Sequence, residues 1–163
     1  MSTLTVKKGD LFKRLANHGP CVVPHCCNDL GIMGSGFVVP LQKIFPTAKS
    51  EYELWYERNK TGGNNTPFEL GRTQFVRVND KVVIANMIGQ HKCGYDENGN
   101  PPVRYLALAK CMEQVGNYAL ARNLEIVTVR FGSGLAGGNI QFIEDLMTEI
   151  WVWNNIPVTI YEI

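Results

Sequence analysis

Short runs of apolar residues alternate along this chain with longer segments in which apolar residues recur every three or four positions. The short runs are rich in Val and Ile and end near Gly, Pro or Asn, a pattern that is typical of strands. They predict strands over residues 4–8, 21–27, 75–78, 82–88, 126–130 and 158–161. The longer segments predict helices over residues 11–17, 37–45 and 103–122, and two more that begin near residues 46 and 139.

This alternation of strands and helices predicts an α/β fold, a three-layer α/β/α sandwich around a mixed, mostly parallel sheet. The two strands that flank Asn79-Asp80 predict one antiparallel hairpin. Pro24 lies inside a strand and predicts an irregularity or a local loss of pairing there. Asn139 is a suitable N-cap for the helix that follows it.

Helical spacing also predicts which side chains of the helices face the core. In the helix over residues 103–122, much of the predicted apolar face consists of Leu106, Ala109, Met112 and Leu120. The three tryptophans also occur in helical apolar patterns, and we interpret them as core residues rather than as a base-stacking platform. They are Trp55, Trp151 and Trp153.

Length and composition predict one soluble domain that comprises residues 1–163. The hydrophobic share is 45% and the charged share is 19%, as in ordinary globular proteins. Sixteen basic and 15 acidic residues give a net charge of +1, which argues against extended nucleic-acid binding as the main activity. A small phosphorylated ligand remains open, because backbone dipoles can hold a phosphate without a charged surface.

The five cysteines are Cys21, Cys26, Cys27, Cys93 and Cys111. Their number is odd and their spacing is not that of a metal site, so we interpret them as reduced thiols in a reducing compartment. Apolar neighbours favour a core role for Cys26 and Cys27 rather than a nucleophilic one. Neither a signal peptide nor a membrane span of about 20 apolar residues is visible. We therefore expect a cytoplasmic protein, in the host cytoplasm if it is viral.

Two glycine-rich segments, residues 31–36 and 131–139, each follow a predicted strand and precede a predicted helix. Glycines lack the Cβ atoms that keep a backbone away from a ligand, and free N–H groups at a helix start attract anions. The carboxyl edge of a mostly parallel sheet is also where α/β folds bind ligands. The two loops therefore predict two walls of one cleft for a phosphate or diphosphate.

The order and spacing of three segments resemble the macrodomain family, whose members bind ADP-ribose. The segments are residues 6–11 (VKKGDL), 25–37 (HCCNDLGIMGSGF) and 131–138 (FGSGLAGG). Nearly the whole chain is covered, and it looks most similar to the branch that contains ADP-ribose 1″-phosphate phosphatases and small ADP-ribosyl hydrolases. Within that branch, residues 25–48 and 158–161 are more similar to the phosphatases.

The resemblance implies a role for each matched position. Asp10 accepts a hydrogen bond from the adenine amino group, Asn28 binds the distal ribose, and the two glycine loops enclose the phosphates. The implied ligand-binding residues are Gly9, Asp10, Leu11, Asn28, Met33, Gly34, Ser35, Gly36, Phe37, Gln90, Phe131, Gly132, Ser133, Gly134, Leu135 and Ala136. Asp10 also suits the N-cap of the next helix, and the two roles are compatible.

Two positions depart from the pattern of the hydrolases in this branch. Those enzymes have a catalytic lysine after the central strand and an aspartate after the Gly-x-Gly-Leu of the second loop. This chain has Gln90 near the first position and Ala136 at the second. The departures speak against lysine-based deacylation and leave hydrolysis by other residues open.

The candidate catalytic residues are His25, Asn28 and Asp29. Imidazole titrates nearest neutral pH, so His25 is the best acid/base candidate, although a buried strand histidine with a satisfied hydrogen bond is an equal alternative. Asn28 could orient water or sugar. Asp29 could hold His25 or act as a base, or it could simply be a loop carboxylate. Gln90 and His91 end the central strand and could reach the cleft, or could only face solvent.

The expected reaction is the hydrolysis of ADP-ribose 1″-phosphate to ADP-ribose and phosphate, without a metal or another cofactor. One alternative is removal of ADP-ribose from a protein or nucleic acid, and another is a non-catalytic ADP-ribose reader. The expected partner is the small molecule alone, and we expect a monomer.

Overall fold

The computed structural model describes residues 4–162. Along the chain the elements are β1 (Leu4–Lys8), α1 (Leu11–Leu15), β2 (Cys21–Asn28), α2 (Val38–Ile44), α3 (Pro46–Lys60), β3 (Thr73–Arg77), β4 (Val82–Gln90), α4 (Tyr105–Arg122), β5 (Glu125–Thr128), α5 (Ile140–Ile150), η1 (Val152–Asn154) and β6 (Val158–Glu162). Each predicted strand and helix is present, with boundaries shifted by a few residues.

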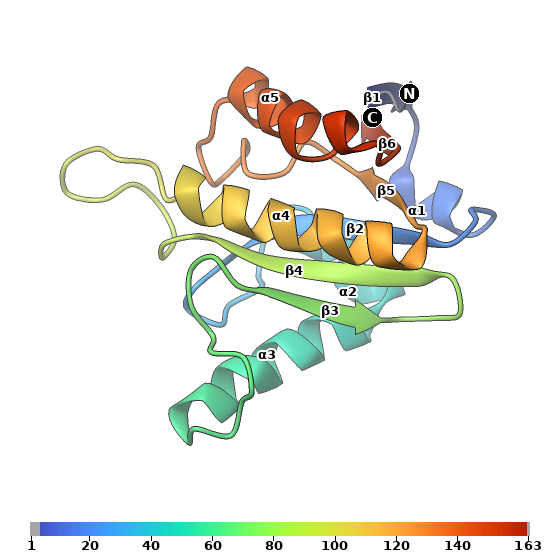
Figure 1. The fold of residues 1–163 in the computed structure, drawn as a ribbon. Helices are drawn as coiled ribbons and strands as arrows, with labels where there is room; N and C mark the ends of the chain where they lie inside the picture. Colours follow the sequence, from blue (N-terminus) through green and yellow to red (C-terminus); the bar gives the residue numbers. More distant parts are fainter. Residues whose placement is uncertain (1–3, 163) are drawn as a thin grey trace.

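The six strands form one sheet in the order β1-β6-β5-β2-β4-β3. In this order, each neighbouring pair among β1, β6, β5, β2 and β4 is parallel, and only the edge strand β3 pairs with β4 in the antiparallel sense. The predicted mixed, mostly parallel sheet and its single hairpin are therefore confirmed. The parallel strands all end at one edge, and the connections that follow β2, β4 and β5 lie there (Figure 1).

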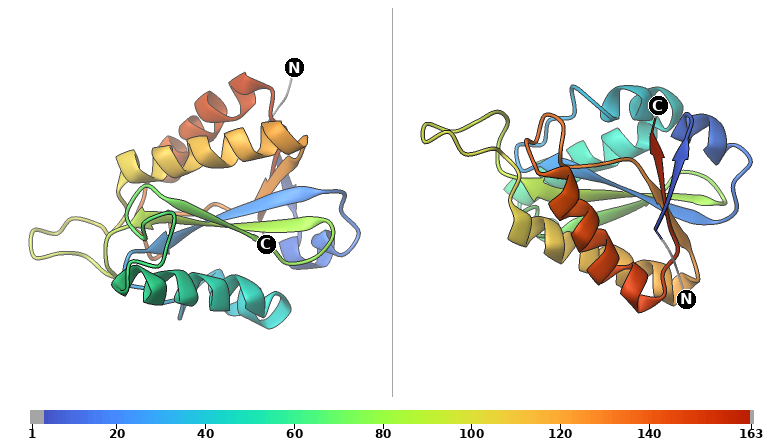
Figure 2. Two further views of the ribbon diagram at one scale, coloured as in Figure 1. Left: turned by 60° about the horizontal axis from the view of Figure 1, so that its bottom comes forward. Right: turned by 90° about the horizontal axis from the view of Figure 1, so that it is seen from above.

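Helices cover both faces of the sheet, as the sandwich prediction requires. Because side chains alternate along a strand, Val22 faces α4 and α5 while Val23 faces α1 and α2. The helix α3 packs on the same face as α2, where Tyr52 and Trp55 are buried. Figures 1 and 2 show α4 and α5 on one side of the sheet and α2 and α3 on the other.

Pro24 produces the predicted loss of pairing on one side of β2. The ladder between β2 and β5 includes only Cys21 and Val22, whereas the ladder between β2 and β4 continues past Pro24. Proline lacks the N–H group that a second neighbour needs. The carbonyl oxygen of Pro24 instead accepts a hydrogen bond from the Thr128 hydroxyl at 2.8 Å. Further along, the register between β2 and β4 shifts after Cys27, and the extra residue is Gly89 of β4.

Two predictions about apolar faces are wrong. In α4 the buried face differs from the predicted one, because Leu106 and Leu120 face solvent. The true face is made by Leu108, Cys111, Met112, Val115 and Ala119, which follow the i, i+3, i+4 pattern and fill the space above β2 and β4. Trp153 is 70% exposed because it follows α5 in a short 3-10 turn, whereas Trp55 and Trp151 are buried as expected.

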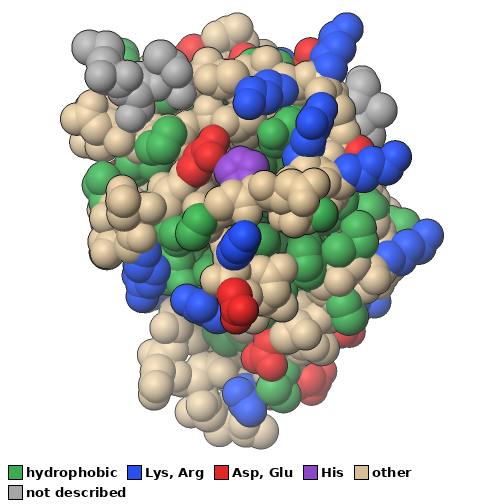
Figure 3. Space-filling model, turned by 90° about the vertical axis from the view of Figure 1, so that its right-hand side faces the viewer, with side chains coloured by type: hydrophobic (Ala, Val, Ile, Leu, Met, Phe, Trp, Pro, Cys, Tyr) green, Lys and Arg blue, Asp and Glu red, His purple; other side chains and the backbone are tan. Residues whose placement is uncertain are grey.

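The end of the molecule that faces away from the connections after β2, β4 and β5 carries charges of both signs. On the described residues, Lys and Arg side chains are spread over this face with Asp and Glu between them (Figure 3). Within residues 4–162, no helix combines the length and the apolar character that a membrane crossing requires.

Candidate functional site

A cleft of about 460 Å³ opens at the carboxyl edge of the sheet, where the neighbouring strands β2 and β5 end. Its walls come from the loop between β2 and α2 and the loop between β5 and α5. The loops face each other closely, since a Cβ atom at Gly36 would lie 3.9 Å from the Leu135 side chain. The lining residues are His25, Cys26, Cys27, Asn28, Ile32, Met33, Gly34, Ser35, Gly36, Phe37, Val38, Gln90, Cys93, Gly94, Val129, Arg130, Phe131, Gly132, Gly134, Leu135 and Ala136.

The Asn28 side chain holds the first glycine loop in its shape. Its Oδ1 accepts hydrogen bonds from the N–H groups of Leu30 (2.9 Å) and Ile32 (3.4 Å) and from the Tyr52 hydroxyl (3.0 Å). Its Nδ2 donates to the Ile32 carbonyl at 2.7 Å and contacts the Cys93 sulfur at 3.5 Å. The weak contact to sulfur leaves one amide proton that a ligand hydroxyl could accept.

The second glycine loop is folded by its own backbone. The N–H of Gly138 donates to the Gly132 carbonyl at 2.8 Å, and the N–H of Gly137 donates to the Gly134 carbonyl at 3.0 Å. A Cβ atom at Gly138 would lie 2.4 Å from the Gly132 oxygen, so this close return of the chain requires glycine. The result is a tight loop whose tip, residues 134–136, lines the cleft.

The helix α5 begins after this loop, and its first residues do not line the cleft. Asn139 is the N-cap, as predicted, and its side chain accepts a hydrogen bond from the Phe142 N–H at 2.9 Å. Residues 137–139 do not line the cleft. The expectation that this helix start binds the anion is therefore corrected, because the loop tip lines the cleft and the helix start does not.

Both loops present unpaired backbone donors. Within residues 4–162, the N–H groups of Gly34, Ser35, Gly36, Gly134 and Leu135 donate to no other protein group. All five residues line the cleft, the first three on one wall and the last two on the other. Free backbone N–H groups in loops of this kind can form an anion-binding concavity.

The cleft has little free side-chain charge. Among its described lining residues there is no Asp or Glu, and the one cation is Arg130. Glu162 and Glu144 both pair with the Arg130 guanidinium, and they raise its pKa above the ordinary value. An anion in this cleft would therefore be held mainly by backbone dipoles.

His25 lies on the floor of the cleft and is only 2% exposed. Its Nε2 is 2.5 Å from Oδ1 of Asn86, its neighbour on β4. The Asn86 amide nitrogen donates to Ala48 and Gln74, so its oxygen must face His25 and Nε2 must carry the proton. Burial lowers the pKa of His25 to about 4, partly offset by the bond to Asn86. At neutral pH the ring is uncharged, with a lone pair on Nδ1.

We expect the buried, uncharged His25 to make the protein less stable as the pH falls from about 6.5 to about 4. In this window the unfolded chain protonates the histidine, while the folded protein keeps it neutral. The pKa difference between 6.5 and 4 corresponds to about 3 kcal/mol lost at the acid end. Urea unfolding at several pH values should show a smaller loss for His25→Gln, whose amide can still donate to Asn86. Parallel stability curves for the two proteins would contradict this assignment.

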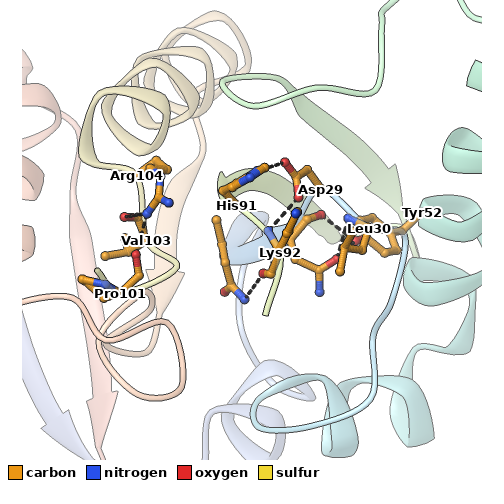
Figure 4. Close-up of polar contacts among 10 residues, drawn as sticks. Asp29, Leu30, Tyr52, His91, Lys92, Pro101, Val103 and Arg104 are labelled. Atoms are coloured by element: carbon orange, nitrogen blue, oxygen red, sulfur yellow. Dashed lines mark hydrogen bonds and ion pairs between the residues drawn. The ribbon is translucent and has the colours of Figure 1, made fainter. Parts of the chain in front are cut away.

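Asp29 does not hold His25, which corrects one of the two roles considered for it. Its Oδ2 lies 2.7 Å from Nδ1 of His91, and its Oδ1 accepts from the Lys92 N–H at 2.8 Å (Figure 4). The register shift leaves Gly89 as an extra residue on β4, so Cys27 is paired with Ile88 and Asn28 with Gln90, and His91 follows next to Asp29. Asp29 and His91 do not line the cleft, and together they fasten the loop after β4 to the first glycine loop.

Asp10 is the N-cap of α1, and its Oδ1 accepts from the Phe12 N–H at 2.9 Å. It does not line the cleft, and neither do Gly9 and Leu11. The Phe12 ring nevertheless stacks on Phe37, a lining residue, with centroids 5.3 Å apart. The start of α1 therefore adjoins the cleft at the β1 side of the sheet.

Some of the remaining predicted site residues line the cleft and others do not. Met33, Gln90 and Phe131 line the cleft, whereas Ser133 does not, and its hydroxyl donates to the Arg130 carbonyl at 3.1 Å. Cys26 also lines the floor, and burial raises the pKa of its thiol to about 12, as its apolar neighbours suggested. Sequence reasoning missed Arg130 and Cys93. Arg130 ends a predicted strand, and only its position after β5 could have marked it.

Comparison with known proteins shows to which family this chain belongs. No protein-family model and no curated protein matches the sequence. Two solved structures cover 99% of both chains: a protein of unknown function from Bacteroides thetaiotaomicron, at 35% identity and a TM-score of 0.91, and a macrodomain protein from Streptomyces coelicolor, at 31% identity and a TM-score of 0.81. The fold is that of a macrodomain, and this chain belongs to the macrodomain family.

More distant structures share the fold alone. The macrodomain of Mycobacterium tuberculosis DarG is 17% identical, with a TM-score of 0.76, and the match covers 100% of this chain and 99% of that one. Thermosipho africanus DarTG, solved in complex with ADP-ribose, is 14% identical, with a TM-score of 0.70; the match covers 96% of this chain and 41% of that one.

Proposed function

We propose that this macrodomain binds ADP-ribose in the cleft and hydrolyses ADP-ribose 1″-phosphate to ADP-ribose and phosphate. The observation that carries the proposal is the pair of glycine loops with unpaired N–H groups across a cleft of about 460 Å³. A diphosphate between two such loops can accept hydrogen bonds from both walls. The similar fold of Thermosipho africanus DarTG, solved with ADP-ribose, adds support.

The proposed ligand lies along the carboxyl edge of the sheet. Asp10 follows β1, the phosphate loops follow β5 and β2, and Asn28 and Gln90 end β2 and β4. The adenine amino group would donate to Asp10 and the distal ribose would lie near Asn28. The reacting 1″ carbon would then lie at the β2–β4 end.

His25 and Gln90 are the side chains best placed for the reaction. The uncharged His25 ring lines the cleft with a lone pair on Nδ1, which lies 3.8 Å from the Cys27 sulfur. An attacking water would replace this weak sulfur contact and donate its hydrogen bond to Nδ1. Gln90 lies at the same end, and its Nε2 donates to the Lys92 carbonyl at 2.9 Å, which fixes the amide. The cleft lining holds Gln90 near the position of the lysine, and Ala136 at the position of the aspartate, of the hydrolase pattern in the resemblance, so the proposed chemistry differs from lysine-based deacylation.

The test is phosphate release from ADP-ribose 1″-phosphate, with EDTA present in one series because the proposed reaction needs no metal. We expect release by the wild type, and a loss of at least about tenfold in His25→Gln with ADP-ribose affinity retained. Asn117→Gln, an exposed change on α4 far from the cleft, is the matched control and should not alter the rate.

Each other result points to a different function. Tight ADP-ribose binding without phosphate release would contradict the phosphatase proposal, and ADP-ribosylated proteins and nucleic acids would then be tested as substrates. Binding without turnover of any of these substrates would indicate an ADP-ribose reader.

A further inference from the structure

Arg130 is the one charged side chain among the described lining residues of the cleft, yet its charge is already neutralised. Its Nε donates to Glu144 on α5 at 2.9 Å, and its Nη1 donates to Glu162 at the end of β6. The side chain remains 29% exposed. One arginine with two carboxylates carries a net negative charge, which disfavours a phosphate beside it.

Strand order places Arg130 at one end of the cleft. Along the sheet edge the strands follow in the order β1, β6, β5, β2 and β4. Arg130 follows β5, and its partner Glu162 ends β6, where the Glu162 carbonyl accepts from the Gly9 N–H at 2.8 Å. Gln90 and Cys93 lie beyond β2, at the opposite end. Arg130 is therefore on the side of Asp10, and the proposed reaction is on the other side.

The two ion pairs also fix how the guanidinium lies. They engage two of its five N–H donors and tie them to two different elements, α5 and β6. A guanidinium tied at its edge leaves its two flat faces out of the ion pairs, and such a face is weakly hydrated and stacks well on aromatic rings. Its sequence neighbours Val129 and Phe131 also line the cleft, so this end is otherwise apolar.

We propose that Arg130, held by Glu144 and Glu162, is the platform on which the adenine base stacks, and that it sets the direction in which the ligand lies. The inference rests on the proposed ADP-ribose binding and adds a specificity residue to it. The paired carboxylates repel the diphosphate from this end, while the flat face accepts a neutral purine. The unpaired N–H groups of the glycine loops then receive the phosphates.

Calorimetry with ADP-ribose on Arg130→Lys tests the inference. Lysine keeps the positive charge for the two carboxylates but has no flat face, so we expect about tenfold weaker binding. Inorganic pyrophosphate, which has no base, is the second probe, and its binding is measured from amide NMR shifts. Its affinity should change less than about twofold. Arg104→Lys is the matched control, since Arg104 contacts the Pro101 and Val103 carbonyls outside the cleft lining.

Each outcome decides between stacking and its alternatives. Unchanged ADP-ribose affinity in Arg130→Lys would overturn the inference. Equal weakening of ADP-ribose and pyrophosphate binding would also overturn it, because it would indicate a phosphate contact.

If Arg130→Lys does not fold, Glu144→Gln is the second variant, which releases one of the two ion pairs and keeps the guanidinium. It should weaken ADP-ribose binding about threefold and leave pyrophosphate unaffected, and equal binding of ADP-ribose to Glu144→Gln and the wild type would count against stacking. A wild type that does not bind ADP-ribose would contradict the proposed function itself.

Discussion

Gly34→Val and Gly134→Val are each expected to weaken ADP-ribose binding by about 100-fold while leaving the melting temperature unchanged. A Cβ atom at either glycine would have no protein atom within 4 Å, and both glycines line the cleft. The added side chain therefore occupies ligand space and keeps the phosphates away from the loop N–H groups. Losing charge-assisted hydrogen bonds on one wall accounts for a change of this size.

The matched control for both variants is Gly19→Val. A Cβ atom at Gly19 also has no protein atom within 4 Å, but Gly19 lies in the turn before β2, away from the cleft. Calorimetry with ADP-ribose and thermal unfolding are measured on all three variants. Retained affinity in both loop variants would show that the ligand does not approach these glycines.

Gly31→Ala is expected to lower the free energy of unfolding by about 3 kcal/mol or more. Gly31 has φ +76°, a conformation that favours glycine, and a Cβ atom there would lie 2.4 Å from the Tyr56 ring. The ring cannot move away freely, because it packs edge-on against Phe68 with centroids 5.2 Å apart. Denaturant unfolding measures the change.

Gly34→Ala, three residues later in the same loop, is the control for this second prediction. It meets no protein atom and its φ is not in the left-handed region, so its free energy of unfolding should change by less than about 0.5 kcal/mol. Equal stability of the two alanine variants would contradict the close packing of Gly31 against Tyr56 of α3. The contrast separates a glycine that the fold requires from one that the ligand requires.

The strands and the loops could be predicted because their signals are local. Val- and Ile-rich runs predicted all six strands, and Asn139 predicted the start of α5. The buried face of α4 could not be predicted in the same way. Leu106 and Leu120 are as apolar as Leu108, and only the position of the sheet beneath the helix decides which of them is covered.

The long-range contacts of the site were beyond sequence reasoning. His25 and Asn86 are 61 residues apart, and nothing in either segment marks them as neighbours on β2 and β4. Asp29 and His91 meet across 62 residues. Such pairs follow from strand order and register, whereas each glycine loop is visible in a single short segment.

Titration of ¹⁵N-labelled protein with ADP-ribose, followed by the amide shifts of each residue, would show whether the two glycine loops bind the diphosphate. We predict large shifts at Gly34, Ser35, Gly36, Gly134 and Leu135, whose N–H groups are unpaired in the structure. The amide of Gly19, in the turn before β2, should not move. Shifts confined to other regions of the protein, or no shifts at millimolar ADP-ribose, would contradict binding of the ligand between the two loops.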